Sequence, residues 1–139
     1  MEARNQGFTL IEIMVVVVII GILGALIIPN VIGRDDEARA TAVKNDIRAV
    51  GNALDLYKLD NFNYPSTDQG LEALVTQPAG FPEPKNYNPS GYLKKIPEDP
   101  WGSPFIYINT GDGYELYSLG RDGQEGGEGY DADIRHEDL

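Results

Sequence analysis

Residues 8–33 read FTLIEIMVVVVIIGILGALIIPNVIG, and this stretch decides the architecture of the chain. From Ile13 to Gly33 there are 21 residues without a charge, most of them isoleucine, valine or leucine. As an α-helix this run would span about 32 Å, which is close to the thickness of a bilayer's hydrocarbon core. We therefore predict one hydrophobic transmembrane helix over residues 8–33.

A secretory signal peptide is the simplest alternative, and it fits poorly. The apolar run is longer than the roughly 7–15 residues of a signal-peptide core. Arg4 is offset by Glu2, and no small-x-small cleavage site follows the run. A plain transmembrane anchor is the stronger alternative.

Glu12 is the feature that a plain anchor does not explain. A charged side chain at the bilayer centre costs about 2.5–3.5 kcal/mol on insertion scales, so it is usually paired. The apolar segment offers no lysine, arginine or histidine. We expect the partner to come from outside the segment, as a lipid head group, a contact at the membrane surface or a positive group on another copy.

The stretch Gly7-Phe8-Thr9-Leu10-Ile11-Glu12 resembles the processing site of type IV pilins and of the pseudopilins of type II secretion. In that family an inner-membrane prepilin peptidase cuts after the glycine and methylates the new N-terminal residue. The resemblance implies that residues 1–7 are a cleaved leader and that Phe8 becomes the methylated N-terminus. Its positive amine would pair with Glu12 of a neighbouring subunit and guide assembly, since a buried charge is tolerable when it meets its opposite.

The helical pattern continues beyond the apolar run. Apolar residues recur alternately four and three positions apart, which is one helical stripe: Val43, Ile47, Val50, Leu54 and Tyr57. This predicts an amphipathic helix over residues 34–60 that packs on a head domain, 34–139. Pro29 favours a kink at the junction of the two halves. With Gly21 and Gly24 it could let the first half stretch during assembly, although the two glycines equally suit close helix packing.

The head has an α+β pattern. Residues 61–100 are rich in loops, with a short helix expected over 67–76 that is capped by Thr67 or Asp68. Within 101–118, segments 105–109 and 114–118 are rich in aromatic and β-branched residues and flank a Gly-Asp-Gly turn. They predict a hairpin in a small antiparallel sheet.

The last segment, 119–139, combines glycines with acids that would repel one another unless solvated or bridged by a cation: Asp122, Glu125, Glu128, Asp131 and Asp133. Calcium takes carboxylate and carbonyl oxygens in flexible geometry, and glycines let carbonyls turn inward. The spacing matches neither an EF-hand nor a phosphate loop. Calcium, Ca2+, is one candidate cofactor for this loop, and solvated acids are the alternative.

Three head motifs resemble the major pseudopilin family of type II secretion: Tyr64-Pro-Ser-Thr-Asp-Gln-Gly-Leu-Glu-Ala-Leu-Val, Asp99-Pro-Trp-Gly-Ser-Pro, and Ser118-Leu-Gly-x-Asp122-Gly through Ala132-Asp133-Ile134. The resemblance implies a type IV pilin-like fold and a calcium loop. It places side-chain ligands on Asp122 and Asp133 and backbone ligands on Leu119 and Gln124. Because loop length varies in the family, Asp131 could replace or assist Asp133.

The composition of the chain argues against two classes of function, nucleic-acid binding and catalysis. Residues 34–139 carry 10 Lys/Arg against 20 Asp/Glu, so the head should repel nucleic acid. There is no cysteine, and we expect the single histidine, His136, to be solvent-exposed. Trp101 and the tyrosines suit a core or an interface. No arrangement of catalytic residues is evident, so we predict that the chain is not an enzyme.

The resemblance implies the major structural subunit of a periplasmic filament, a homo-oligomer that drives export of folded proteins. Implied partners are minor pseudopilins, the prepilin peptidase, the assembly platform with its ATPase, and lipids of the bacterial inner membrane, which the subunit crosses once. Two alternatives stay open: a type IV pilin for adhesion, motility or DNA uptake, and a singly anchored periplasmic calcium-binding protein. The missing cysteines weigh against the first, because many type IV pilins carry a C-terminal disulfide.

Overall fold

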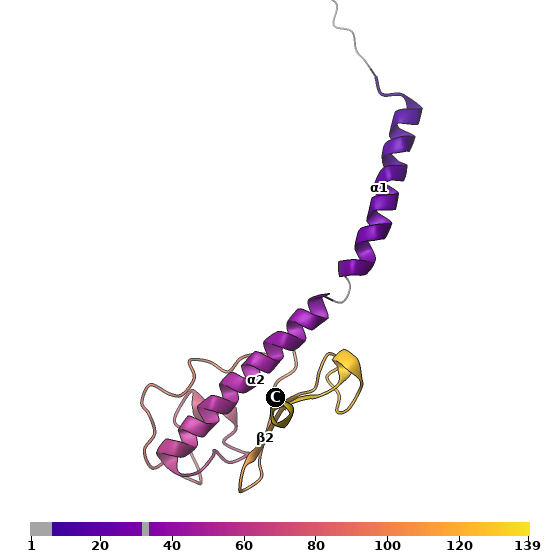
Figure 1. Ribbon diagram of the computed structural model, residues 1–139. Coiled ribbons are helices and arrows are strands. Elements are labelled where there is room, and N and C mark those ends of the chain that lie inside the picture. Colours follow the sequence, from indigo (N-terminus) through magenta and orange to yellow (C-terminus); the bar gives the residue numbers. More distant parts are fainter. Residues whose placement is uncertain (1–6, 32–33) are drawn as a thin grey trace, which may run out of the picture. The chain divides into compact units, whose positions relative to one another are not determined.

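The computed structural model describes residues 7–31 and 34–139, which fall into two compact units divided between Asp35 and Asp36. Helix α1 (Leu10–Val31) makes up most of the first unit, and α2 (Arg34–Asn61) begins at its end. The second unit adds three strands and three short 3-10 helices (Figure 1): η1 (Leu71–Leu74), η2 (Gly129–Asp131) and η3 (His136–Asp138). The expected leader, residues 1–7, lies outside the described residues except for Gly7.

Helix α1 confirms the helix expected from the apolar run. Its large apolar side chains are exposed from Leu10 (81% exposed) to Leu26 (69%). Pro29 lies within the helix. Over residues 7–31 and 34–139 we find no helix that meets the length and hydropathy needed to cross a bilayer. The span expected over 8–33 ends on residues 32 and 33, which are outside the described residues.

Helix α2 confirms the predicted stripe. The five apolar residues of the stripe are all buried, together with three more on the same face: Gly51, Ala53 and Asn61. Each fully buried side chain of this size stabilises the fold by about 1.5–3 kcal/mol. The stripe forms one side of the head core, and Leu71, Leu74, Tyr107 and Leu116 lie on the other.

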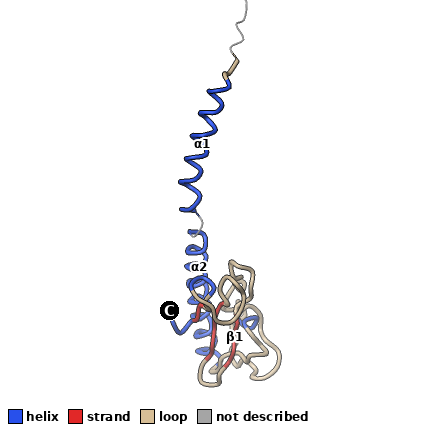
Figure 2. The backbone as a smooth tube through the Cα atoms, turned by 90° about the vertical axis from the view of Figure 1, so that its right-hand side faces the viewer, coloured by secondary structure: helices blue, strands red, loops and turns tan. Residues whose placement is uncertain are grey.

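The sheet is antiparallel, in the order β1-β2-β3, and its strands lie alongside α2 (Figure 2). Strands β1 (Ile106–Asn109) and β2 (Tyr114–Ser118) form the predicted hairpin, with Tyr107 opposite Leu116. Strand β3 (Ile134–Arg135) pairs with the end of β2, where Ile134 lies opposite Ser118. This third strand was not predicted, because two residues are too few to show a periodic pattern. It ties the end of the C-terminal loop to its beginning.

The helix expected over 67–76 is smaller than predicted. Only η1 (Leu71–Leu74) forms there, as a 3-10 turn with Leu71 and Leu74 buried. Gly70 takes a φ of 61°, in the left-handed region that interrupts a helix. Thr67 does not cap the turn, since its Oγ1 instead accepts a hydrogen bond from the Asn109 amide at 3.0 Å. A tertiary contact therefore outcompetes the local cap.

His136 was expected to be exposed, and that expectation is wrong. The ring is partly buried and lies 5.4 Å from the ring of Tyr114, centroid to centroid. It packs over Gly51 of α2, where a Cβ atom would lie 2.8 Å from the His136 Cδ2 atom. A glycine in the middle of a helix is thus explained by the ring that occupies the space above it.

We expect Gly51→Ala to lower the melting temperature in the wild-type background, because its methyl group overlaps the His136 ring. In a His136→Ala background the same change should raise stability by about 1 kcal/mol, since alanine is the better helix former. Thermal melts followed by circular dichroism compare the four chains. Equal destabilisation in both backgrounds would show that the His136 ring is not the obstacle.

Candidate functional site

The bond between Gly7 and Phe8 lies in an irregular segment just before α1. Phe8 is 85% exposed, and no other described part of the chain lies within 4 Å of where a Cβ atom of Gly7 would be. The bond thus lies in exposed, irregular chain, where proteolytic cleavage concentrates. Processing between Gly7 and Phe8 stays a prediction.

Glu12 has a hydrogen-bonding partner within the chain that was not predicted. Its carboxylate accepts bonds from the Thr9 amide at 2.9 Å and from the Thr9 hydroxyl at 3.1 Å. The Glu12 amide donates back to the Thr9 hydroxyl at 3.3 Å, which completes a capping box at the start of α1. The spacing Thr-x-x-Glu is a known signature of this motif and could have revealed it. The capping box supplies hydrogen bonds but no positive charge.

The C-terminal loop, residues 119–133, leaves β2 and returns to β3. Gly120 takes a φ of 69°, and a Cβ there would lie 2.6 Å from the Ala132 carbonyl oxygen, so only glycine permits the two ends to come this close. Leu119, one of the predicted backbone ligands, is partly buried beside this crossing. Three residues after Leu119, Asp122 Oδ1 accepts a bond from the Gln124 amide at 3.0 Å. The loop therefore has a defined conformation.

Asp133 is the buried acid of the loop. Its side chain is 9% exposed, and its Oδ2 lies 3.4 Å from a guanidinium nitrogen of Arg135. Its other oxygen, Oδ1, is buried and has no hydrogen-bond partner among the described residues. Leaving a buried polar atom unpaired costs about 1–3 kcal/mol, which makes Oδ1 a candidate to bind an ordered water or a cation.

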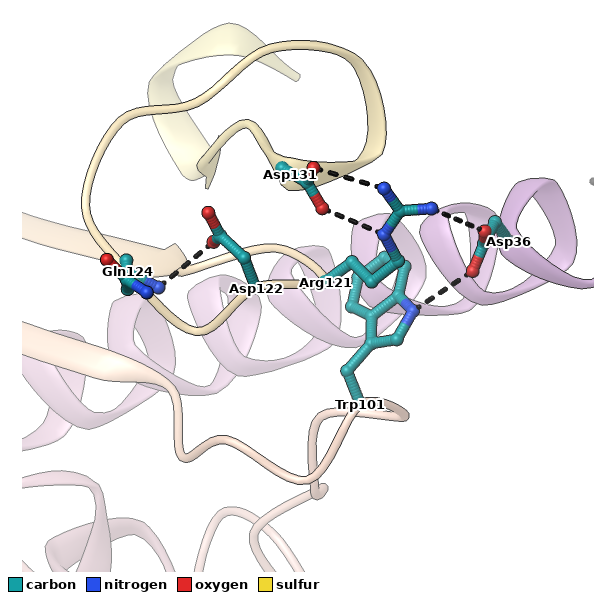
Figure 3. A network of polar contacts seen from close by, with 6 residues as sticks. All are labelled: Asp36, Trp101, Arg121, Asp122, Gln124 and Asp131. Atoms are coloured by element: carbon teal, nitrogen blue, oxygen red, sulfur yellow. Dashed lines mark hydrogen bonds and ion pairs between the residues drawn. The ribbon is translucent and has the colours of Figure 1, made fainter.

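Asp131 is held differently, by Arg121. The Arg121 guanidinium binds both carboxylate oxygens of Asp131, at 2.8 and 3.0 Å, and its third nitrogen reaches Asp36 on α2 at 3.1 Å (Figure 3). These hydrogen bonds hold the pKa of Asp131 below its usual value and raise the pKa of Arg121. Trp101 completes the network by donating its indole N–H to Asp36 at 3.4 Å. This network could not be predicted from a local sequence pattern, because Arg121 and Asp36 are 85 positions apart.

A second buried acid supports the base of the loop. Asp99 is 3% exposed and accepts bonds from the Ser118 hydroxyl and, at 2.8 Å, from the Trp101 amide. Ser118 in turn accepts a bond from the Gly120 amide at 3.1 Å. Nearby on α2, burial and then the charge of Asp99 raise the pKa of Asp46 above its usual value. The motif that begins at Asp99 thus fixes the first residues of the loop.

Within the described ranges, no group of three or more acidic, histidine or cysteine side chains is placed to hold a metal ion. The structure therefore does not bring all five loop acids together. A cation at this loop would need backbone carbonyl oxygens or water besides the carboxylates. Calcium, unlike zinc, accepts such ligands.

Comparison with protein families gives two matches. Residues 30–137 match the family model described as type II secretion system protein G. Residues 3–28 match the model of the prokaryotic N-terminal methylation motif. The first match covers nearly all of the head and the last residues of the first unit, and the second covers most of α1 and the residues just before it.

Individual relatives agree with these families. The chain is 62% identical over 137 residues to the type II secretion system core protein G of Pseudomonas aeruginosa, covering 96% of each chain. It is 54% identical over 133 residues to that of Vibrio cholerae, covering 94% of this chain and 90% of the relative. Among solved structures, the crystal structure of the major pseudopilin of enterohaemorrhagic Escherichia coli matches with a TM-score of 0.68 and 42% identity. The match covers 80% of this chain and 96% of that one.

We expect Asp46→Asn to raise the melting temperature at pH 7. The folded-state pKa of Asp46 is raised above its unfolded value of 3.8, so the ionised carboxylate opposes folding when the pH is above both values. That penalty disappears as the pH falls below both, so the two chains should converge near pH 3.5. Thermal melts from pH 7 to 3.5 test this.

The matched control for Asp46→Asn is Asp112→Asn on the exposed hairpin turn, which removes the same charge from an acidic protein. A gain as large in Asp112→Asn would mean that net charge, and not the surroundings of Asp46, causes the effect.

Proposed function

Because this chain belongs to the protein G family of the type II secretion system, we propose that processed copies of it polymerise into a periplasmic filament that drives export of folded proteins across the outer membrane. Family membership makes the chain a major pseudopilin, a structural subunit and not an enzyme. The observation that supports the filament most directly is the first unit, whose exposed apolar helix follows an accessible processing site. Such a helix needs lipid or other helices to cover it.

Assembly in this proposal begins in the inner membrane, with the head in the periplasm. The prepilin peptidase removes residues 1–7 and methylates Phe8, and the apolar segment 8–33 holds the subunit in the lipid. The new Phe8 amine then pairs with Glu12 of a neighbouring copy. The capping box matters here, because Thr9 satisfies the Glu12 carboxylate by hydrogen bonds until that positive partner arrives.

Growth of the filament requires partners that lift each subunit out of the membrane. Family membership implies that these partners are an assembly platform, its ATPase and the minor pseudopilins. Pro29 lies in α1, where the lost backbone hydrogen bond would ease the change in the helix as lipid is replaced by neighbouring subunits.

We also propose that the C-terminal loop binds calcium through Asp122, Asp133 and the carbonyl oxygens of Leu119 and Gln124. The unpaired Oδ1 of Asp133, on a side chain only 9% exposed, supports this. Arg121 occupies both oxygens of Asp131, which favours Asp133 over Asp131 as the second carboxylate. When bound, calcium would join the two ends of the loop and neutralise repulsion among its acids.

For the filament, we expect an in-frame deletion of the gene to trap exported proteins in the periplasm. Restoring the wild-type gene should release them to the medium, whereas Gly7→Asp should not, because the leader then remains attached. Immunoblots of medium and periplasm measure export, and the shift in subunit mass measures cleavage. Export that continues unchanged in the deletion strain would overturn the proposed function. Gly113→Asp, in the hairpin turn of the head, serves as the matched control, because a Cβ atom there makes only ordinary contacts.

For the calcium site, we expect calcium at ten times its dissociation constant to stabilise the wild-type chain by about 1.4 kcal/mol. Asp133→Asn and Asp122→Ala should abolish this gain and the response to a chelator. Thermal melts in calcium and in excess chelator measure both effects, and Glu128→Gln, which changes an exposed acid in the same loop, should retain them. A calcium response that survives in both ligand variants would overturn the site.

A further inference from the structure

We propose that Arg121 is a positioning residue that couples the calcium loop to the first turn of α2. This inference rests on the calcium site proposed above. It concerns a different property, which is the transmission of the loop's state to the helix that leads toward the first unit.

Arg121 closes the loop on itself. Its side chain holds Asp131 by two hydrogen bonds, and its backbone amide donates to the Tyr130 carbonyl at 2.9 Å. Between these contacts lie nine residues with four glycines, which are costly to order. Because Asp122 follows Arg121 and Asp133 lies two residues after Asp131, Arg121 holds together the two segments that carry the proposed carboxylate ligands. Preorganisation of this kind strengthens binding by lowering its entropy cost.

Arg121 also makes the two acids Asp131 and Asp133 different from each other. It is the only basic residue from Gly120 to Ile134, and it occupies both oxygens of one particular carboxylate. Asp131 is thereby withheld, while Asp133 keeps an unpaired oxygen. The planar guanidinium is suited to this task, because it can grip one carboxylate with two parallel bonds and still present a third nitrogen to another.

The third guanidinium nitrogen of Arg121 couples the loop to α2. It binds Asp36, the residue at which the second unit begins, in the first turn of α2. The same carboxylate accepts the indole N–H of Trp101, so Asp36 is held by two groups of the head (Figure 3). The first backbone N–H groups of a helix lack partners within the helix, and its first turn frays unless something holds it. Ordering of the loop by calcium would thus fix Arg121, then Asp36, and so the start of α2.

Each of these ion pairs is partly exposed, with 48% of the Arg121 side chain and 25% of the Asp36 side chain accessible. Exposed pairs contribute modestly, so the expected coupling is about fivefold in calcium affinity. Coupling is reciprocal, and weakening the Asp36 contact should therefore weaken calcium binding by the same factor. High salt should reduce this coupling, because it screens the exposed ion pairs.

The experiment uses the full chain in detergent micelles. Calcium affinity is measured by calorimetry, with magnesium as the ion control. The state of the first turn is measured by fluorescence of Trp101, the only tryptophan, and by amide exchange in the peptide covering residues 34–44. Arg121→Lys is the main variant, because it keeps the charge but cannot hold both carboxylates. Arg48→Lys, on the exposed face of α2, is the matched control, and Asp36→Asn tests reciprocity.

In the wild type and Arg48→Lys, we expect calcium to change Trp101 fluorescence and to slow exchange in the peptide. In Arg121→Lys both responses should vanish, and calcium affinity should fall about fivefold in Arg121→Lys and Asp36→Asn alike. If the wild type binds calcium but the first turn does not respond, or if both variants keep wild-type affinity, the coupling is overturned and the calcium site stands. If the wild type binds no calcium, both are overturned, and the filament function is unaffected.

Discussion

The head depends on the burial of one stripe of α2. Val43, Ile47, Val50, Leu54 and Tyr57 are each at most 2% exposed, and they form the surface against which the hairpin and η1 pack. A sheet with two longer strands and one of two residues would not be stable alone, so the helix is what makes the sheet possible. Even the glycine on this face has a purpose, since Gly51 makes room for His136 and lets the C-terminus close over the helix.

The acidic loop shows how a strongly charged segment can still be ordered. Its carboxylates are kept apart by having different partners: Asp131 lies on Arg121, Asp122 on a backbone amide, and Asp133 is buried with one oxygen free. Buried polar atoms without partners are rare in native proteins, and a divalent cation satisfies such an oxygen while offsetting repulsion among its neighbours. The base of the loop is fixed through Asp99 and Ser118 without any cation.

In the first unit, apolar side chains are exposed and not buried. Its helix exposes apolar side chains from Leu10 to Leu26, and the carboxylate of Glu12 is satisfied by Thr9 within the same turn. A subunit of a filament must be acceptable both to lipid and to other copies, and a helix that is apolar all round meets both requirements. Membership of the protein G family places this chain among pseudopilins and not among the type IV pilins, which the processing motif by itself does not separate.

The sequence alone determined the helices, the hairpin, the processing motif and the family, because these follow from local periodicity, turn residues and short motifs. The period of the apolar residues specified the buried face of α2 correctly. Only the tertiary structure decided that η1 is a single 3-10 turn, that a third strand closes the sheet, and that Arg121 links Asp131 to Asp36. These features depend on contacts between positions far apart in the chain, where no local pattern specifies the partner. Thr67 is one example, because its hydroxyl accepts a hydrogen bond from the distant Asn109 amide and does not cap the nearby helix. The roles of Asp131 and Asp133 differ for the same reason, since burial and the reach of one arginine distinguish two acids that look alike in the sequence.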